Sequence, residues 1–577
     1  MSESCLSKEH DKGGRHGLFW MLALILIGAG YYGLYFRCGF NLADEGSVML
    51  LSQRILQGER PLTDLMLGYN ILWFYPISGL FWLFGVSLVA MRIYFFSLAL
   101  ITALLGYSIV CRITGHRLYA FIVGLLLVAY PGTSYRVYLP FLVMVNGYCL
   151  LRLIRDNGWL WVTAGATVLG LTFLVRVDVG IFFALIWIGT LVLNAFAPRH
   201  PDRKRAALLP SIVLTAIVVL AVHLPVYFLA KAQGFNREFL QQYVTSYRLM
   251  RDGIIRGNLM PAKAAKAPVA RLVNINANKP DVAAPAQEAE AGRMNLARKP
   301  FAQIWKAKKW KARAQAFVTY APIFSLGALL TWTLSIGIRR RLEPDIYPRL
   351  LTILVLSGGA LTLFPQFFGF RPDVSHLAEF MPGFIVAAAA GGFYLFQNIR
   401  AKKYVGPPCA MLVCILLVLH LAVWIVFAFP QRGAGTIALR SGRTEPFHAE
   451  NGVNILLTSE EAAGYGEIRD LVIKNAQPEE YVVCYPYSPG INILANRPTY
   501  EWSLYVDNAV RAPNFDAKTI AKLKSKKPAV IVINDWAINQ SKDSRFSVWA
   551  GKTQQYIEEN YTLAGTILKY QIYALKE

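Results

Sequence analysis

The sequence predicts a mainly α-helical membrane protein: a polytopic bundle of about eleven transmembrane helices followed by a small extracytoplasmic α/β domain. The chain has 577 residues, of which 55% are hydrophobic, and its mean hydropathy is +0.38. Apolar blocks of about twenty residues, long enough as helix to cross a hydrocarbon core of roughly 30 Å, recur from residue 17 to residue 429. Lys and Arg gather at the ends of these blocks, where topology signals are placed.

The first apolar block follows Lys8, Lys12 and Arg15 and lacks a clear small-residue cleavage site, so we interpret it as a retained helix rather than a signal peptide. The predicted spans lie near residues 17–36, 90–111, 118–134, 137–152, 159–175, 180–197, 208–231, 317–338, 349–367, 378–398 and 406–429.

Residues 71–86 form a further apolar run whose assignment decides the topology. The run contains Pro76 and Gly79 and is rich in Trp and Phe, which is typical of a helix lying at the membrane interface. If this run does not span and the N-terminus is cytoplasmic, every rich basic cluster in a short loop falls inside. If it spans, those clusters fall outside, so the positive-inside rule favours the first arrangement. The clusters are Arg112/Arg117, Arg152/Arg155, Arg199/Arg203/Lys204/Arg205, Arg339/Arg340/Arg341/Arg349 and Arg400/Lys402/Lys403.

This topology predicts a transmembrane domain over residues 1–430 and an extracytoplasmic domain over residues 431–577. The first outer loop covers about 37–89, and two short outer turns lie at 176–178 and 371–376.

Segment 232–316 is a long outer loop with sixteen Lys plus Arg and five Asp plus Glu. Loops longer than about 60 residues are largely exempt from the positive-inside rule. Its flanks, 236–254 and 301–317, have the pattern of amphipathic helices for an anionic membrane surface, or the loop is simply a tolerated basic insertion. The Ala-, Pro- and Lys-rich stretch 257–299 between them is predicted to be flexible.

The C-terminal region alternates helical and strand patterns. Residues 458–476 predict a helix capped by Ser459, and residues 480–487, 528–535 and 569–577 predict strands. A small α/β domain without a nucleotide-binding fingerprint follows from this pattern.

The formal net charge of +24 permits nucleic acid as a partner, but the positions of the basic residues favour membrane orientation instead. A basic surface also suits anionic lipids or a phosphate-bearing substrate. The sequence contains no GxxxxGK[ST], HExxH, GxSxG or zinc pattern, which disfavours nucleotide-driven pumps and the common hydrolases. We expect no cofactor; no metal-ligand set is evident, although a divalent metal stays possible.

Asp44 and Glu45 are adjacent carboxylates at the point where the chain leaves the first span. Ionisable groups beside apolar runs are costly and therefore candidates for function. Inverting glycosyl transfer needs one carboxylate to take the proton from an acceptor hydroxyl, and a phosphate leaving group needs no protonation. The structural alternative is that Asp44 caps a helix while Glu45 faces solvent.

Basic and acidic residues in the two outer turns are candidates for phosphate and sugar binding. Arg176 can hold a lipid-linked phosphate and Asp178 can bind sugar or acceptor, or the two can form an internal ion pair. Arg371 and His376 can hold phosphate oxygens, and Asp373 can orient His376 or bind a sugar hydroxyl, unless this is only a polar interfacial turn.

Further along the first loop, Arg60 is a candidate for the phosphate site. Asp64 and Tyr69 are candidates for contacts to sugar or acceptor. For each of these side chains the alternative is a solvated helix face.

The sequence presents a series of motifs in a fixed order. The first span is followed by DEG, QGERPLTDL, an aromatic near-membrane helix and LFGVSLVAMRIYFFSLAL, and LVRVDVG and RPDVSHL come further on. This order resembles the GT-C superfamily of polyprenyl-phosphate-dependent glycosyltransferases, the relatives of protein mannosyltransferases and aminoarabinose transferases. The resemblance implies a sugar donor on a polyprenyl phosphate, such as undecaprenyl phosphate in the bacterial inner membrane. It places the catalytic aspartate on Asp44, with Glu45 as its neighbour.

The sequence therefore predicts a monomeric, inverting membrane glycosyltransferase that acts on a glycan, lipid or protein acceptor. Two other functions stay open. A lipid-linked-sugar flippase or transporter would move the headgroup without chemistry, and a glycan polymer ligase would use a diphosphate-linked donor.

Overall fold

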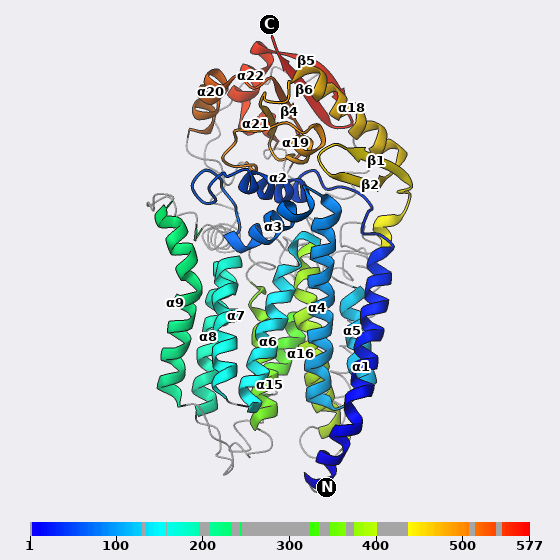
Figure 1. Cartoon of the computed structure of the whole chain (residues 1–577), viewed down its shortest axis with the longest axis vertical. Coiled ribbons are helices and arrows are strands. Elements are labelled where there is room, and N and C mark those ends of the chain that lie inside the picture. Colours follow the sequence, from blue (N-terminus) through cyan, green and yellow to red (C-terminus); the bar gives the residue numbers. More distant parts are fainter. Residues whose placement is uncertain are drawn as a thin grey trace, which may run out of the picture.

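A computed structural model describes residues 3–129, 134–156, 158–195, 207–232, 243–244, 322–331, 333–334, 347–364, 374–400, 437–506, 514–537 and 545–576. Long helices run side by side in a bundle, and the C-terminal α/β domain covers one end of it (Figure 1). The N-terminus lies at the opposite end of the bundle, and the C-terminus lies at the far side of the α/β domain.

The described bundle helices coincide with the predicted apolar runs. Their bounds are α1 Glu3–Gly33, α4 Leu88–Thr114, α5 Arg117–Ala129, α6 Tyr138–Asp156, α7 Trp159–Val175, α8 Val177–Ala195, α9 Leu208–Ala232, α15 Tyr347–Leu361 and α16 Val374–Arg400. Among the described residues, α4, α6, α8 and α9 are long and apolar enough to cross a membrane. The chain is thus a multi-pass membrane protein, while the count of about eleven spans stays a prediction because residues 406–429 lie outside the described ranges.

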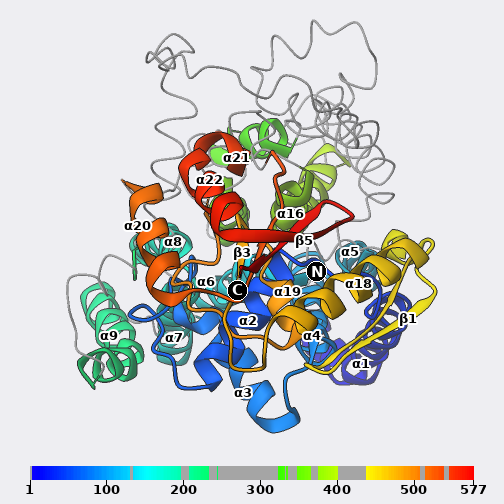
Figure 2. The same cartoon turned by 90° about the horizontal axis from the view of Figure 1, so that it is seen from above.

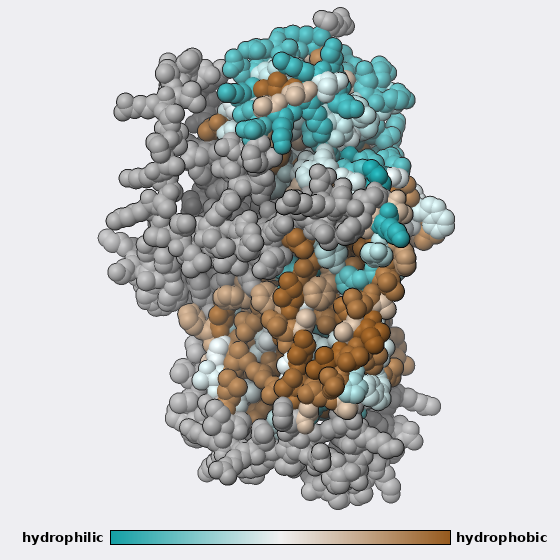
Figure 3. Space-filling view, turned by 90° about the vertical axis from the view of Figure 1, so that its left-hand side faces the viewer, coloured by the Kyte–Doolittle hydropathy of each residue, from teal (hydrophilic) through white to brown (hydrophobic). Residues whose placement is uncertain are grey.

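Glycines let the bundle helices approach closely, as is common in membrane proteins. A Cβ on Gly106 of α4 would lie 2.3 Å from Leu127 of α5, and one on Gly165 of α7 would lie 2.1 Å from Trp187 of α8. The outer face of the bundle is apolar, whereas the α/β domain above it is largely hydrophilic (Figure 3).

The ambiguous run 71–86 folds as the short helix η1 (Ile71–Trp73) followed by α3 (Tyr75–Phe84). Ten residues of α-helix extend about 15 Å, which is half of a hydrocarbon core, so α3 does not span. It lies beside α2 at the end of the bundle (Figure 1). Trp82 and Phe84 are 74% and 70% exposed, as expected for a helix that anchors in the interface.

The C-terminal domain is a sheet with helices on both faces. Its four-stranded sheet has the order β3-β4-β6-β5, in which β3 (Val482–Tyr485) and β4 (Val530–Ile533) are parallel. β6 (Tyr570–Leu575) is antiparallel to both β4 and β5 (Tyr561–Ile567). All four residues of β4 are buried, because the sheet is covered on both faces. The other elements are η4 Ile437–Arg440, β1 Glu445–Ala449, β2 Val453–Leu457, α18 Ser459–Asn475, α19 Gly490–Ala495, α20 Phe515–Lys526, α21 Phe546–Trp549 and α22 Gly551–Asn560.

The three predicted strands and the predicted helix of this region are confirmed, but the predicted cap is wrong by one residue. Thr458, not Ser459, is the N-cap of α18. Its hydroxyl accepts from the backbone N–H of Glu461, whose carboxylate accepts from the N–H of Thr458. This reciprocal pair stabilises the helix start more fully than a cap at the next residue would, because it satisfies two backbone donors.

The first outer loop lies between the bundle and the α/β domain. Its helix α2 (Asp44–Leu56) packs against α19, and α18, α19, α22 and β5 lie over this end of the bundle (Figure 2). Leu42 accepts a backbone hydrogen bond of 2.7 Å from Gly490, and Gly39 donates one of 2.8 Å to Leu456 of β2. The first loop and the C-terminal domain are therefore joined by main-chain hydrogen bonds at several places, including bonds from Met66 to Trp502 and from Leu88 to Gly452.

Candidate functional site

Asn41 sets the start of α2. Its side-chain oxygen accepts hydrogen bonds of 3.0 Å from the backbone N–H groups of Ala43 and Asp44, so the chain turns there and the helix begins at Asp44. Ala43 occupies the N-cap position and makes no side-chain cap bond. The alternative in which Asp44 caps the helix is thus wrong, and its carboxylate is available for other contacts.

The Asp44 carboxylate receives one phenol on each oxygen. Tyr135, in the short helix η2 (Ser134–Arg136), donates to Oδ2 at 2.6 Å, and Tyr487 of the C-terminal domain donates to Oδ1 at 3.1 Å. Burial raises the pKa of both phenols well above their usual range, and the charge of Asp44 raises these pKa values further. Both phenols therefore stay protonated and act as donors, which fixes the direction of the carboxylate.

Glu45 is engaged in a different way. Its side chain is 7% exposed and forms a bidentate ion pair with Arg92 of α4, with distances of 2.9 and 2.7 Å. Arg92 also donates to the backbone oxygens of Phe36, Cys38 and Gly39. Glu45 therefore does not face solvent as the structural alternative required; it ties the first loop to α4.

A second buried ion pair, which the sequence analysis did not single out, lies next to Tyr135. Arg136 pairs with Glu379 of α16 at 3.1 Å, and its guanidinium lies 5.3 Å from the centre of the Tyr135 ring. The negative charges of Glu379 and Asp44 both act on Arg136. In the sequence, Arg136 is an isolated basic residue in the turn 134–137, between two apolar runs. This position is the signal from which a functional or paired side chain could have been predicted.

Arg176 and Asp178 lie at the turn between α7 and α8, and the structure shows the internal ion pair. Arg176 donates to Asp178 at 2.8 Å, and both side chains are buried. Tyr69 lies against the guanidinium, 5.8 Å from ring centre to Cζ, and stacks on Trp73 at 3.8 Å. Tyr69 also interacts electrostatically with Tyr135 and Arg136, so it connects this pair with the surroundings of Asp44.

Arg60 and Asp64 form a local pair at the outer part of the first loop. Arg60 donates to Asp64 at 2.8 Å, and the two side chains are 47% and 34% exposed. The same turn contacts the C-terminal domain, where Met66 donates to the backbone oxygen of Trp502. The structure thus places this pair on the domain seam and shows no contact of either side chain with Asp44.

The remaining predicted site residues cannot be placed. Arg371 and Asp373 lie outside the described residues, and His376 belongs to α16 with only its backbone described. Within the described residues there is no group of three or more His, Cys, Asp or Glu side chains arranged to hold a metal ion.

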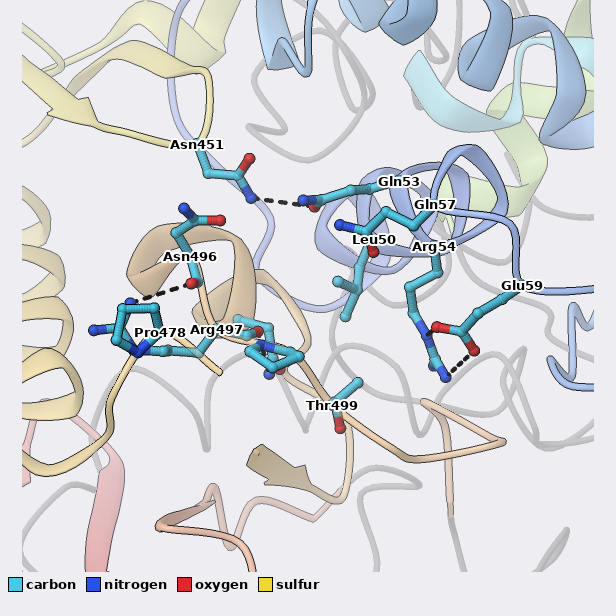
Figure 4. A pocket seen from close by; sticks show the side chains of 12 residues that line it. Leu50, Gln53, Arg54, Gln57, Glu59, Asn451, Pro478, Asn496, Arg497 and Thr499 are labelled. Carbon is cyan, nitrogen blue, oxygen red and sulfur yellow. Dashed lines mark hydrogen bonds and ion pairs between the residues drawn. The ribbon is translucent and has the colours of Figure 1, made fainter. Parts of the chain in front are cut away.

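A polar cavity of about 240 Å³ lies on the seam further along α2. Gln53 and Arg54 of α2, with its C-cap residue Gln57, face Asn451, Asn496 and Arg497 across it (Figure 4). Arg54 is held by Glu59 at 2.7 Å, and Arg497 donates to three backbone oxygens, so the cationic groups of this cavity are already engaged.

The fold is similar to that of a solved archaeal glycosyl-transferring enzyme. The apo oligosaccharyltransferase of Archaeoglobus fulgidus aligns with 97% of this chain and 74% of its own, at a TM-score of 0.51 and 13% identity. The same enzyme in complex with zinc and sulfate aligns at a TM-score of 0.50 and 15% identity, over 96% of this chain and 73% of its own.

The chain shares its fold with this oligosaccharyltransferase. This confirms the architecture that the sequence resemblance implied. ArnT of Cupriavidus metallidurans bound to undecaprenyl phosphate also aligns, over 96% of this chain and 98% of its own, at a TM-score of 0.49 and 14% identity. No family model matches the sequence, and no curated protein matches it.

The arrangement combines one oriented carboxylate, Asp44, with the buried cations Arg136 and Arg176. Asp44 is fixed by phenols and is not neutralised by a direct ion pair among the described side chains, unlike Glu45, Asp178 and Glu379. A carboxylate in this state can accept a proton from a hydroxyl that lies within hydrogen-bond reach.

Proposed function

We propose that this protein is an integral membrane glycosyltransferase that moves a sugar from a polyprenyl-phosphate donor to an extracytoplasmic acceptor, with inversion. The observation that carries the proposal is the state of Asp44. Its carboxylate lies between the bundle and the C-terminal domain and is oriented by neutral donors, the two phenols and the side-chain amide of Asn41. The GT-C-like fold and the resemblance of the first-loop motifs support the same reaction class.

In the proposed reaction, Asp44 takes the proton of an acceptor hydroxyl as that oxygen attacks the anomeric carbon of the sugar. The new bond forms between the acceptor oxygen and the anomeric carbon, while the bond from that carbon to the phosphate oxygen breaks. The phosphate leaves with the bonding electron pair as polyprenyl phosphate. Its departure needs no general acid, because a phosphate is a stable anion at neutral pH.

Arg176 and Arg136 are the described cations that we assign to the leaving phosphate. Each is paired with a carboxylate, so each is held in place. Arg136 feels the charge of Asp44, and Arg176 lies against Tyr69. Fixed positive charges stabilise the negative charge that develops on the leaving oxygen without reorganising during the reaction. Arg371 and His376 stay predicted additions to this set.

We place the site on the extracytoplasmic side of a bacterial inner membrane. The basic residues Arg112, Arg117 and Arg155 belong to the helix ends opposite the α/β domain (Figure 1). The positive-inside rule then puts that end in the cytoplasm and puts Asp44 and the C-terminal domain outside.

The test is Asp44→Asn in the purified full-length chain. We expect loss of at least about 100-fold in transfer, because general-base catalysis contributes roughly 10²–10⁴-fold. Folding and donor binding should change little, because an amide keeps the shape and accepts one of the two phenol hydrogen bonds. The assay follows release of polyprenyl phosphate from radiolabelled undecaprenyl-phosphate sugars. Near-normal release by the variant would exclude Asp44 as the base, and movement of the intact lipid-linked sugar without release by the wild type would indicate a transporter.

A further inference from the structure

We propose that the C-terminal α/β domain completes the active site, with Tyr487 as a positioning residue that holds the Asp44 carboxylate for proton transfer. The inference rests on the proposed function, in which Asp44 is the base. It adds that the two halves of the chain act on the same carboxylate, so the domain is part of the catalytic apparatus rather than an accessory on the membrane enzyme.

The two oxygens of Asp44 are held from opposite sides of the seam. Tyr135 belongs to the membrane portion and binds Oδ2, whereas Tyr487 belongs to the α/β domain and binds Oδ1. A carboxylate bound at one oxygen only still rotates about its Cβ–Cγ bond, whereas bonds at both oxygens fix its plane. Removal of the Tyr487 hydroxyl therefore leaves the charge in place but releases its orientation, on which proton transfer depends.

The ring of Tyr487 is itself held in position. It lies edge-on against Tyr505, with 5.0 Å between ring centres and an angle of 86°. Burial keeps the pKa of this phenol well above its usual range, so the hydroxyl stays protonated and donates at neutral pH. The contact is consequently a stable O–H to carboxylate hydrogen bond, one of the stronger classes in proteins.

The backbone next to Tyr487 is locked to the start of α2. Three residues after it, Gly490 donates to Leu42 at 2.7 Å. A Cβ on Gly46 would lie 2.4 Å from the backbone nitrogen of Gly490, so the two main chains meet with no space for a side chain. The seam is closely packed next to Asp44 and opens into the polar cavity further along α2 (Figure 4). Such packing transmits the position of the domain directly to the base.

The test compares Tyr487→Phe with Tyr500→Phe in the full chain. Both variants remove one phenol oxygen from the same domain, but the Tyr500 hydroxyl is buried without a hydrogen-bond partner and the Tyr487 hydroxyl binds Asp44. A panel of radiolabelled undecaprenyl-phosphate hexoses and pentoses is first tested with the wild type. The donor that the wild type turns over is then used for both variants. We expect kcat of Tyr487→Phe to fall roughly 10- to 100-fold, the range for a lost hydrogen bond to a charged group.

Tyr487→Phe should keep the wild-type KM for the donor and should stay fully folded at the assay temperature, with a small fall in the thermal midpoint from the lost hydrogen bond. Tyr500→Phe should keep wild-type kcat. A rise in KM or a fall in the midpoint that accounts for the lost rate would show a merely structural role and overturn the inference. Phe retains the ring that packs on Tyr505, so the variant keeps the contacts that support the fold.

The double variant Asp44→Asn/Tyr487→Phe separates the two proposals. If Tyr487 acts through Asp44, its substitution costs nothing further in the Asp44→Asn background, because the interaction is already lost. A full additional loss in that background would overturn the positioning role. If Asp44→Asn is inactive but Tyr487→Phe keeps wild-type transfer activity, this inference alone is refuted. If Asp44→Asn is active, the proposed function is refuted.

Discussion

Replacement of Glu45 by Ala should unfold the first loop rather than stop the chemistry, and this distinguishes the two adjacent acids. In the structure Glu45 accepts 2.9 and 2.7 Å bonds from Arg92 and a 3.1 Å bond from the backbone N–H of Asn41. The side chains of Glu45 and Arg92 are 7% and 4% exposed. Glu45→Ala leaves the guanidinium buried with only neutral carbonyl acceptors, and breaking a buried pair in this way costs about 3–5 kcal/mol.

The measurement is thermal and denaturant unfolding of the detergent-solubilised chain, combined with transfer activity per folded molecule. We expect Glu45→Ala to lower the unfolding midpoint strongly and Glu45→Gln to lower it less, since the amide oxygen still accepts from Arg92. Asp64→Asn is the matched control, because it breaks an exposed ion pair of the same loop and should leave the midpoint near the wild-type value. A Glu45→Gln variant with wild-type stability and no transfer would refute this reasoning and place Glu45 in the chemistry.

Two further predictions concern the seam and the topology. Gly46→Ala should reduce both kcat and the unfolding midpoint, because its Cβ would lie 2.4 Å from the backbone of Gly490. The expected loss of stability is about 1–3 kcal/mol. Gly466→Ala, on an open face of α18, is the control and should be neutral or stabilising. If Gly46→Ala has the unfolding midpoint and the kcat of the wild type, the two main chains do not pack tightly at this position. A cysteine introduced at exposed Lys526 should react with a membrane-impermeant maleimide in intact cells, and one at exposed His116 should react only after lysis. The opposite pattern would invert the proposed orientation.

Much of the architecture follows from periodicity and charge. The described bundle helices begin and end close to the predicted apolar runs, and the non-spanning run 71–86 folds as an interfacial helix, because both depend on local composition. Strands β3, β4 and β6 were predicted for the same reason, whereas β1, β2 and β5 were not predicted. The predicted N-cap of α18 differs from the observed one by one residue. Either hydroxyl of Thr458-Ser459 satisfies the sequence pattern, and only the geometry of the helix start selects between them.

The sequence also identified Asp44 and Glu45 as a pair, but it could not assign different roles to them. Two adjacent helical residues point in directions about 100° apart, so which one meets Arg92 depends on how α2 is rotated against α4. The ion pair Arg176–Asp178, in contrast, joins near neighbours in the chain and was foreseen as an alternative.

Composition, apolar runs and basic clusters by themselves determined that this chain is a membrane bundle with an acidic first loop and an α/β domain, because those properties are local to each segment. Only the tertiary structure decided what surrounds the acid. Tyr135, Arg136 and Tyr487 are separated from Asp44 by about 90 to more than 400 positions. No sequence spacing reports such contacts, since they arise from the docking of one folded half of the chain on the other.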